Sequence, residues 1–300
     1  MPAEAEKTVL PGIESILIAT DLSGRSDKAL ARGMALAAAY GAKVRIVHVV
    51  DDDQPLSLVE DEVARAADII EASAKPIAAR LGIEAPEIDI WRGLASVAIV
   101  KLADEINPDL LVMGAHRRQL LRDVFVGTTV ERVIRNSGRP VLMVNLDADV
   151  PYRKALAAVD MSQHSIDALK FAHRTGFLGC SQLAVVHAFL PLADGLMRYA
   201  DVERNKIEEY VESVADDAHK ALTHMLREEG LSRLASDVIV EEGDAVGVIK
   251  SAVARLHPSL VVLGTRGQAG LKRVLIGSVA NAVLRDVECD LLAHAAGNES

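Results

Sequence analysis

The sequence of 300 residues has few aromatic residues, few cysteines and no excess of basic residues. Aromatic side chains make up only 3% of it, so a surface that stacks bases or sugars is not expected. The 33 Lys and Arg are outnumbered by 43 Asp and Glu, and the formal net charge of −10 argues against nucleic acid or an anionic membrane as a partner. Half of the residues are hydrophobic and a quarter are charged, which is typical of globular proteins.

The sequence also lacks disulfide, metal and membrane signals. Two cysteines, Cys180 and Cys289, cannot build a disulfide framework, and no Cys/His spacing of a metal site is present. The longest apolar runs, such as residues 97–100 and 110–113, are too short to span a bilayer. Residues 1–13 have no apolar core segment, so no signal peptide is expected. We predict a cytoplasmic protein.

An internal repeat divides the chain. An apolar segment that ends in Asp-x-Ser occurs at residues 15–23 and again at 154–162, an offset of 139 residues. From Gly93 and Gly243 onward the matching positions are 150 residues apart, so the second copy has an insertion of 11 residues, which we place around residues 195–230. The sequence therefore predicts a tandem duplication, with domains at residues 1–148 and 149–300.

Each copy alternates short apolar strands with longer segments of helical periodicity. In the first copy we predict strands at residues 15–20, 44–50, 87–91, 110–113 and 141–144, and helices between Ser23 and Gly41 and at 55–81, 95–106 and 128–136. This alternation predicts an α/β fold, with two doubly wound, Rossmann-like, five-stranded parallel sheets. Ligands of such sheets bind beyond the carboxyl ends of the strands, where the strand order reverses.

A glycine-rich loop follows the fourth predicted strand of the second copy. Gly264-Thr-Arg-Gly267 is followed, after nine residues, by Gly277 and Ser278 at the start of a predicted helix. Glycines let a ligand approach the backbone, and a helix N-terminus attracts an anion. The loop therefore suits a phosphate chain, although glycines in a plain strand-to-helix connection would give the same pattern.

This pattern, G-x-x-G-x9-G-[S/T] with Asp-x-Ser after the first strand, resembles the ATP-binding subset of the universal stress protein family. The resemblance covers nearly the whole chain, once per copy. It implies a fold like that of the adenine nucleotide alpha hydrolases. Members of the universal stress protein family commonly pair through their fifth strands, so the resemblance also implies that residues 141–144 pair with 291–294 as a pseudo-dimer within one chain. It also implies ATP, with or without Mg²⁺, as the ligand. A homodimer of whole chains stays open.

The resemblance implies contacts with adenine, ribose and phosphate at matching positions of both copies. In the second copy these are Asp160, Ala188, Leu263, Gly264, Arg266, Gly267, Gly277, Ser278 and Val279. In the first copy they are Asp21, Val49, Gly114, His116, Gly127 and Thr128. Arg117 stands where the second copy has Gly267, and its side chain would either block the backbone or pair with a phosphate. We expect an altered first site and an intact second site.

Several residues that could suggest other chemistry have simpler interpretations. We expect His48 and His187 to be packed and hydrogen-bonded, residues 51–53 to form a solvated loop, and Cys289 to be a core residue. A capping role toward the next helix would also explain Asp160. We assign no catalytic residue and no metal ligand.

The predicted function is that of a universal stress protein, an ATP-binding regulatory or protective protein of the stress response that acts with a protein partner. The sequence lacks a Walker A motif, a dinucleotide fingerprint and a G-x-S-x-G elbow, so we expect no enzyme, and at most slow ATP hydrolysis. Two alternatives stay open. One is a scaffold or chaperone-like stress protein with a vestigial ligand site, and the other is an enzyme that uses ATP on a substrate bound between the copies.

Overall fold

The computed structural model describes residues 10, 12–115, 128–179, 182–200, 202–265 and 277–294. The elements of the first copy are β1 Ser15–Thr20, α1 Gly24–Tyr40, β2 Lys43–Val50, α2 Leu56–Leu81, β3 Glu87–Arg92, α3 Ala95–Ile106, β4 Leu110–Gly114, α4 Thr129–Asn136 and β5 Val141–Val144. Those of the second copy are β6 Lys154–Ala158, α5 Gln163–Arg174, β7 Gln182–Phe189, α6 Asp194–Tyr199, α7 Arg204–Glu228, β8 Ala235–Glu242, α8 Ala245–Leu256, β9 Leu260–Gly264, α9 Ser278–Asp286 and β10 Asp290–His294.

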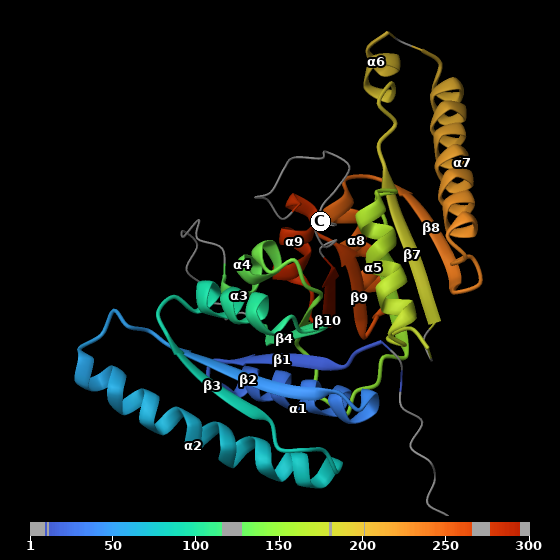
Figure 1. Cartoon of the computed structure of the whole chain (residues 1–300). Helices are drawn as coiled ribbons and strands as arrows, with labels where there is room; N and C mark the ends of the chain where they lie inside the picture. Colours follow the sequence, from blue (N-terminus) through green and yellow to red (C-terminus); the bar gives the residue numbers. More distant parts are fainter. Residues whose placement is uncertain are drawn as a thin grey trace, which may run out of the picture.

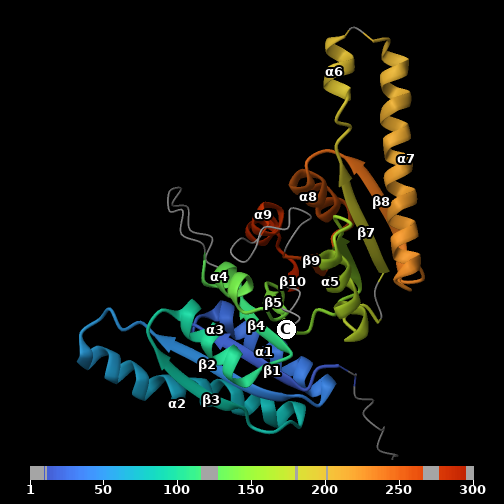
Figure 2. The same cartoon turned by 45° about the horizontal axis from the view of Figure 1, so that its top comes forward.

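Within these residues ten strands form one sheet, in the order β3-β2-β1-β4-β5-β10-β9-β6-β7-β8 (Figures 1 and 2). Neighbouring strands are parallel inside each copy. The copies meet where β5 pairs antiparallel with β10, with Leu142 opposite Leu292. The predicted α/β fold and the predicted pairing of the fifth strands are both confirmed.

Helix ends follow local chemistry. Helix α1 begins after Ser23 and ends at Gly41, whose left-handed φ of 66° is accessible to glycine at little cost. Helices α3 and α8 end at Asn107 and His257, which also adopt left-handed conformations. Each of these two residues precedes a proline, which disfavours continuation of the helix.

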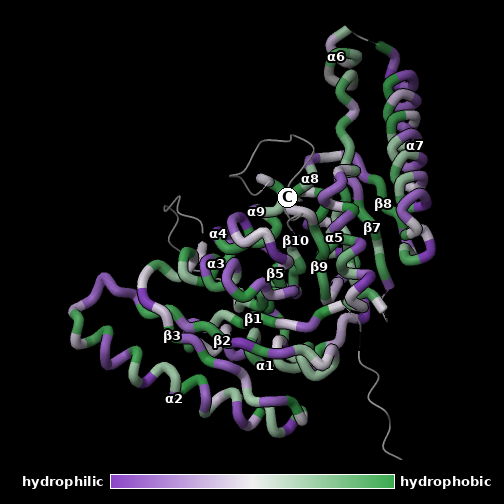
Figure 3. The backbone as a smooth tube through the Cα atoms, in the orientation of Figure 1, coloured by the Kyte–Doolittle hydropathy of each residue, from purple (hydrophilic) through white to green (hydrophobic). Residues whose placement is uncertain are grey.

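Helices cover both faces of the sheet and bury an apolar core on each. One core contains side chains of α1, α2, α5 and α7, and the other contains side chains of α3, α4, α8 and α9. Both cores include residues of both copies, and the central strands are the hydrophobic centre of the molecule (Figure 3). All four residues of β5 are buried. The two copies therefore share their packing as well as their sheet.

An arm made of α6 and the upper part of α7 extends beyond the sheet (Figure 1). Helix α6 has no counterpart between β2 and β3, where α2 alone forms the connection, so it accounts for the insertion that the repeat offsets predict. Leu192, Leu196 and Tyr199 on this arm are 86%, 72% and 91% exposed. No helix among the described residues is both long and apolar enough to cross a membrane.

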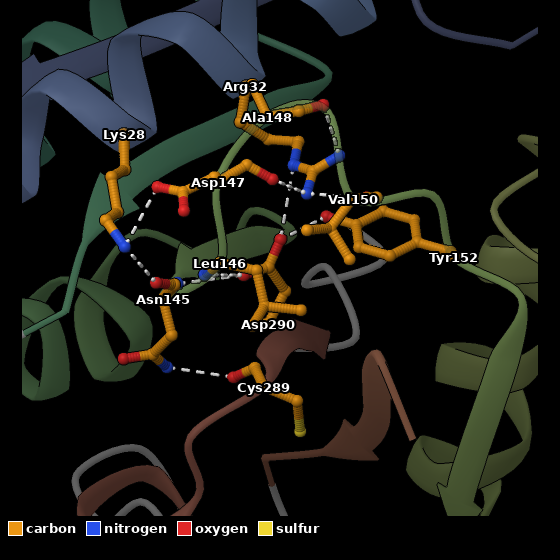
Figure 4. Close-up of polar contacts among 10 residues, drawn as sticks. All are labelled: Lys28, Arg32, Asn145, Leu146, Asp147, Ala148, Val150, Tyr152, Cys289 and Asp290. Atoms are coloured by element: carbon orange, nitrogen blue, oxygen red, sulfur yellow. Dashed lines mark hydrogen bonds and ion pairs between the residues drawn. The ribbon is translucent and has the colours of Figure 1, made fainter. Parts of the chain in front are cut away.

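A buried ion pair fastens the segment that connects the copies (Figure 4). The Asp290 carboxylate, fully buried at the start of β10, accepts hydrogen bonds from the N–H groups of Asn145 and Leu146 at 2.8 Å. It also accepts the Tyr152 hydroxyl at 2.6 Å and lies 3.3 Å from Nε of Arg32. The Arg32 guanidinium donates to three carbonyls of the connecting segment. This network joins α1, the connection and β10.

Candidate functional site

A cleft of about 590 Å³ opens at the carboxyl ends of β1, β2 and β4. It lies where the strand order reverses, because β2 follows β1 on one side and β4 lies on the other. Asp21, Val49, Gly114 and Thr128, the four predicted contacts of the first copy that the structure describes, all line this cleft. The other two, His116 and Gly127, lie outside the described residues, as does Arg117.

The cleft has an apolar floor and a polar rim. Val47, Ile99 and Met113 contribute apolar side chains to its lining, and Asp21 and Arg25 contribute opposite charges. The starts of α1, α3 and α4 complete the walls. Such a combination of apolar surface with a few polar groups is typical of sites for small organic ligands.

Asp21 closes the turn that leads from β1 into α1. Its carboxylate accepts the Ser23 N–H at 3.1 Å, and the intervening Leu22 adopts a left-handed φ of 58°. Burial would raise the pKa of Asp21, but hydrogen bonds from Ser23 and Ser26 and the nearby Arg25 outweigh it, so the pKa lies below its usual value. A negative charge therefore stands at the mouth of the cleft at neutral pH.

The second copy repeats this turn. The Asp160 carboxylate accepts the Ser162 N–H at 3.0 Å, and Met161 adopts a φ of 61°. Ser162 caps α5 by accepting the Ser165 N–H. Asp160 thus supports the residue that caps the helix, which gives the recurring Asp-x-Ser a structural role in addition to any contact with a ligand.

Three further predicted contacts of the second copy lie at the carboxyl ends of its strands. Ala188 is near the end of β7, and Leu263 and Gly264 end β9. Strand β9 pairs with β6, and Asp160 lies two residues after the end of β6. Helix α9 starts at Ser278, directly after Gly277, and Val279 packs against one of the two cores. Arg266 and Gly267 lie outside the described residues.

The first glycine of each loop is required by packing. A Cβ at Gly114 would lie 2.9 Å from the Arg25 carbonyl oxygen, and one at Gly264 would lie 2.8 Å from the Ser165 nitrogen. These two glycines therefore let the strand end touch the start of α1 or α5. Gly277 differs, because the nearest atom to an added Cβ is the Thr265 carbonyl oxygen at 3.8 Å.

The starts of α4 and α9 differ in how they are capped. Thr128 accepts the Glu131 N–H at 3.3 Å, and the Glu131 carboxylate accepts the Thr128 N–H at 3.0 Å, which is a capping box. This capping box was not among the predicted features, although the sequence carries its Thr-x-x-Glu signature. Gly277 offers α9 no side-chain cap, so, among the residues that the structure describes, no cap competes with an anion for the first-turn N–H groups of α9.

The simpler interpretations of the other candidate residues are confirmed. Nδ1 of His48 lies 2.9 Å from the Thr20 carbonyl oxygen, and Nδ1 of His187 lies 2.8 Å from that of Val159. Residues 51–53 are exposed. Cys289 is buried, and burial raises the pKa of its thiol to about 12. The described part of the chain holds no cluster of three or more His, Cys, Asp or Glu side chains that could bind a metal ion.

Fold and cleft define this chain as a doubly wound α/β protein made of two fused copies. The model of the universal stress protein family matches residues 12–145 and again residues 151–293. The chain belongs to the universal stress protein family and carries two of its domains in tandem.

Known proteins resemble one copy or the whole chain. Universal stress protein A homolog 1 of Coxiella burnetii is 31% identical over 149 residues, which are 47% of this chain and 95% of that protein. The crystal structure of a universal stress protein from Archaeoglobus fulgidus covers 94% of this chain and 98% of its own, with a TM-score of 0.68 and 20% identity. A universal stress protein solved in complex with cAMP covers 45% of this chain and 98% of its own, with 25% identity and a TM-score of 0.37.

Proposed function

We propose that this universal stress protein binds ATP and acts as a regulatory or protective protein of the stress response in the cytoplasm. The observation that carries the proposal is the cleft of the first copy, which combines an apolar floor, a carboxylate and helix N-termini in about 590 Å³. This volume is within the range of roughly 300–1,000 Å³ that small-molecule sites occupy. The domains that bind would be residues 1–148 and 149–300.

The lining of the first cleft fits an adenine nucleotide. Val47, Val49 and Met113 would contact the base, and the Asp21 carboxylate would accept hydrogen bonds from ribose hydroxyls. The start of α4 at Thr128 would receive phosphate, since helix N-termini favour anions. Mg²⁺ would bind through the phosphates, because the described residues offer no acidic cluster for it.

We propose that the second copy is the stronger site. Asp160, Ala188 and Leu263 would surround the nucleoside, and Gly264, Arg266, Gly267, Gly277, Ser278 and Val279 would hold the phosphates. The start of α9 supports this assignment, since Gly277 provides no side-chain cap that would compete with a phosphate for its N–H groups. Arg117 would make the first site weaker. In neither copy do we assign a residue that would activate water, so we expect at most slow hydrolysis.

Calorimetry with ATP tests the proposal. Gly277→Val should remove binding at the second site, because the branched side chain would occupy the space at the start of α9. Among the described residues the added Cβ meets nothing closer than 3.8 Å, so the variant should fold, and a urea titration checks this. Gly267→Arg gives the second loop the arginine that the first loop has at Arg117, and it should weaken ATP binding at the second site. The absence of saturable binding to the wild-type protein would contradict the proposal, as would unchanged binding by Gly277→Val.

A nucleotide-independent scaffold or chaperone-like role is favoured by one feature, the exposed apolar side chains of the α6 arm. Leu192, Leu196 and Tyr199 offer a protein partner a surface that does not depend on a ligand. This alternative predicts normal stress survival when Gly277→Val and Gly127→Val disable both loops. Loss of survival in that double variant would favour the nucleotide-dependent role.

A further inference from the structure

The start of α4 forms part of the wall of the first cleft and is organised by Glu131. Thr128, Thr129 and Val130 line the cleft. The Glu131 carboxylate accepts the Thr128 N–H at 3.0 Å and so fixes the residue that begins the helix. Glu131 itself is only 2% exposed. The position of this part of the wall therefore depends on how the buried Glu131 carboxylate is held.

Glu131 is held by the other copy. Nε of Arg285 donates to one carboxylate oxygen of Glu131 at 2.7 Å, and a second guanidinium nitrogen donates to the other at 3.3 Å. Arg285 lies in the last turn of α9. A buried carboxylate without a cation is strongly unfavourable, so Arg285 holds the Glu131 carboxylate in position. Hydrogen bonding and charge attraction from Glu131 in turn raise the pKa of Arg285.

The equivalent contact on the other side of the pseudo-twofold is missing. The repeat offset of 150 residues relates Glu131 to Asn281 and Arg285 to Arg135. The Asn281 side-chain oxygen is buried and accepts no hydrogen bond, so Arg135 does not donate to it. The ion pair between Arg285 and Glu131 therefore has no equivalent between Arg135 and Asn281. Through it the second copy supports the cleft of the first copy.

We propose that Arg285 is a positioning residue for the cleft of the first copy and that it couples this cleft to the ligand site at the start of α9. Helix α9 begins at Ser278, and Arg285 lies about two turns further along the same helix. A ligand that displaces or orders α9 acts on the Arg285–Glu131 pair and through it on the Thr128 N–H. The positioning role rests on geometry alone, and the coupling rests on the proposed nucleotide site.

Amide hydrogen exchange of the ligand-free protein tests the positioning role. In Arg285→Met the amides of Thr128 and Glu131 should exchange about tenfold faster or more, the scale expected when a charge-assisted hydrogen bond is lost. Arg135→Met is the matched control, because Arg135 pairs with no carboxylate among the described residues, and it should exchange as the wild type does. Arg285→Lys should restore part of the protection. Unchanged exchange in Arg285→Met would overturn the role, and so would equal acceleration by both methionine variants.

Mg²⁺–ATP tests the coupling at a concentration that fills the stronger second site and leaves the weaker first site largely empty. ATP should change exchange at the start of α4 in the wild type and in Arg135→Met, and this change should vanish in Arg285→Met although calorimetry still detects binding. It should vanish in Gly277→Val as well, where the second site is disabled. A change that persists in Arg285→Met would overturn the coupling. Persistence in Gly277→Val would also overturn it, since ATP would then act in the first cleft alone.

These outcomes separate the two proposals. If ATP binds and the start of α4 does not respond, the coupling fails and the proposed function stands. If ATP does not bind, the proposed function and the coupling fail together, while exchange in the ligand-free variants still decides the positioning role.

Discussion

Gly264 and Gly277 of the second copy have different structural roles, and substitution by alanine should separate these roles. Gly264→Ala places a Cβ 2.8 Å from the Ser165 nitrogen, so the start of α5 must shift. We expect a loss of about 1–3 kcal/mol of unfolding free energy, as for other overpacked sites. Gly277→Ala should lose less than about 1 kcal/mol, the scale of an altered helix cap. Urea unfolding measures both, and equal losses would contradict this division of tasks.

The thiol of Cys289 should be chemically silent in the folded protein. Burial raises its pKa to about 12, so almost no thiolate is present at pH 8. In a Cys180→Ser background, iodoacetamide at pH 8 should leave the native protein unlabelled and should label it fully in urea, as read by mass spectrometry. Labelling of the native protein at the rate of a free thiol would refute the burial of Cys289.

At the residue scale, the sequence predicts where site residues lie along the chain better than it predicts which side chains contact one another. Four of the six predicted contacts of the first copy line one cleft, because the repeat and the strand ends are visible in the sequence. The pairing of Glu131 with Arg285 joins residues 154 positions apart, and no local pattern indicates it. The steric need for Gly264 also escapes the sequence, because it depends on how closely α5 approaches β9.

At the scale of elements, the exposed side chains of the arm should tolerate polar substitution, whereas the buried side chains of α7 should not. Changing Leu192, Leu196 and Tyr199 together to Gln should alter the unfolding free energy by less than about 0.5 kcal/mol per site, because these side chains stay in water in the folded protein. Leu222→Gln is the control: this α7 side chain is fully buried, so the change should cost about 2–5 kcal/mol. Thermal unfolding measures both variants. If the melting temperature falls as far in the triple variant as in Leu222→Gln, the side chains of the arm are not exposed as described.

Most elements could be predicted because their signals are local. The predicted bounds agree with the structure for the strands at residues 15–20 and 141–144 and for the helix at 95–106. Apolar runs and the positions of Gly and Pro define these bounds in the sequence. Helix α6 was expected only as part of an insertion placed around residues 195–230, and not as a separate helix. Its six residues carry no helical periodicity long enough to detect, and packing against α7 sets its position.

At the scale of the molecule, the two copies behave as one body for reasons that their separate sequences do not contain. The antiparallel contact of β5 with β10 makes one sheet, and both apolar cores extend across it. The pairing was expected from the family resemblance. The buried ion pair of Arg32 with Asp290 was not, because its partners lie in a helix of one copy and a strand of the other and become neighbours only after both copies fold.

This ion pair gives the last prediction, on cooperativity. Asp290→Asn leaves the buried Arg32 guanidinium without its counter-charge, which should cost about 3–5 kcal/mol of unfolding free energy. Asp147→Asn is the control, since Asp147 is 67% exposed and pairs with Lys28 at the surface (Figure 4), where such pairs contribute about 1 kcal/mol or less.

Two probes can follow the copies separately. Trp91, the single tryptophan of the chain, lies in β3 and reports on the first copy by fluorescence, whereas circular dichroism reports on both. In urea the two transitions should coincide for the wild type and for Asp147→Asn, and should separate for Asp290→Asn, because the network that joins α1, the connecting segment and β10 is then broken. Coincident transitions at the wild-type midpoint in Asp290→Asn would show that the sheet and the shared cores alone hold the copies together.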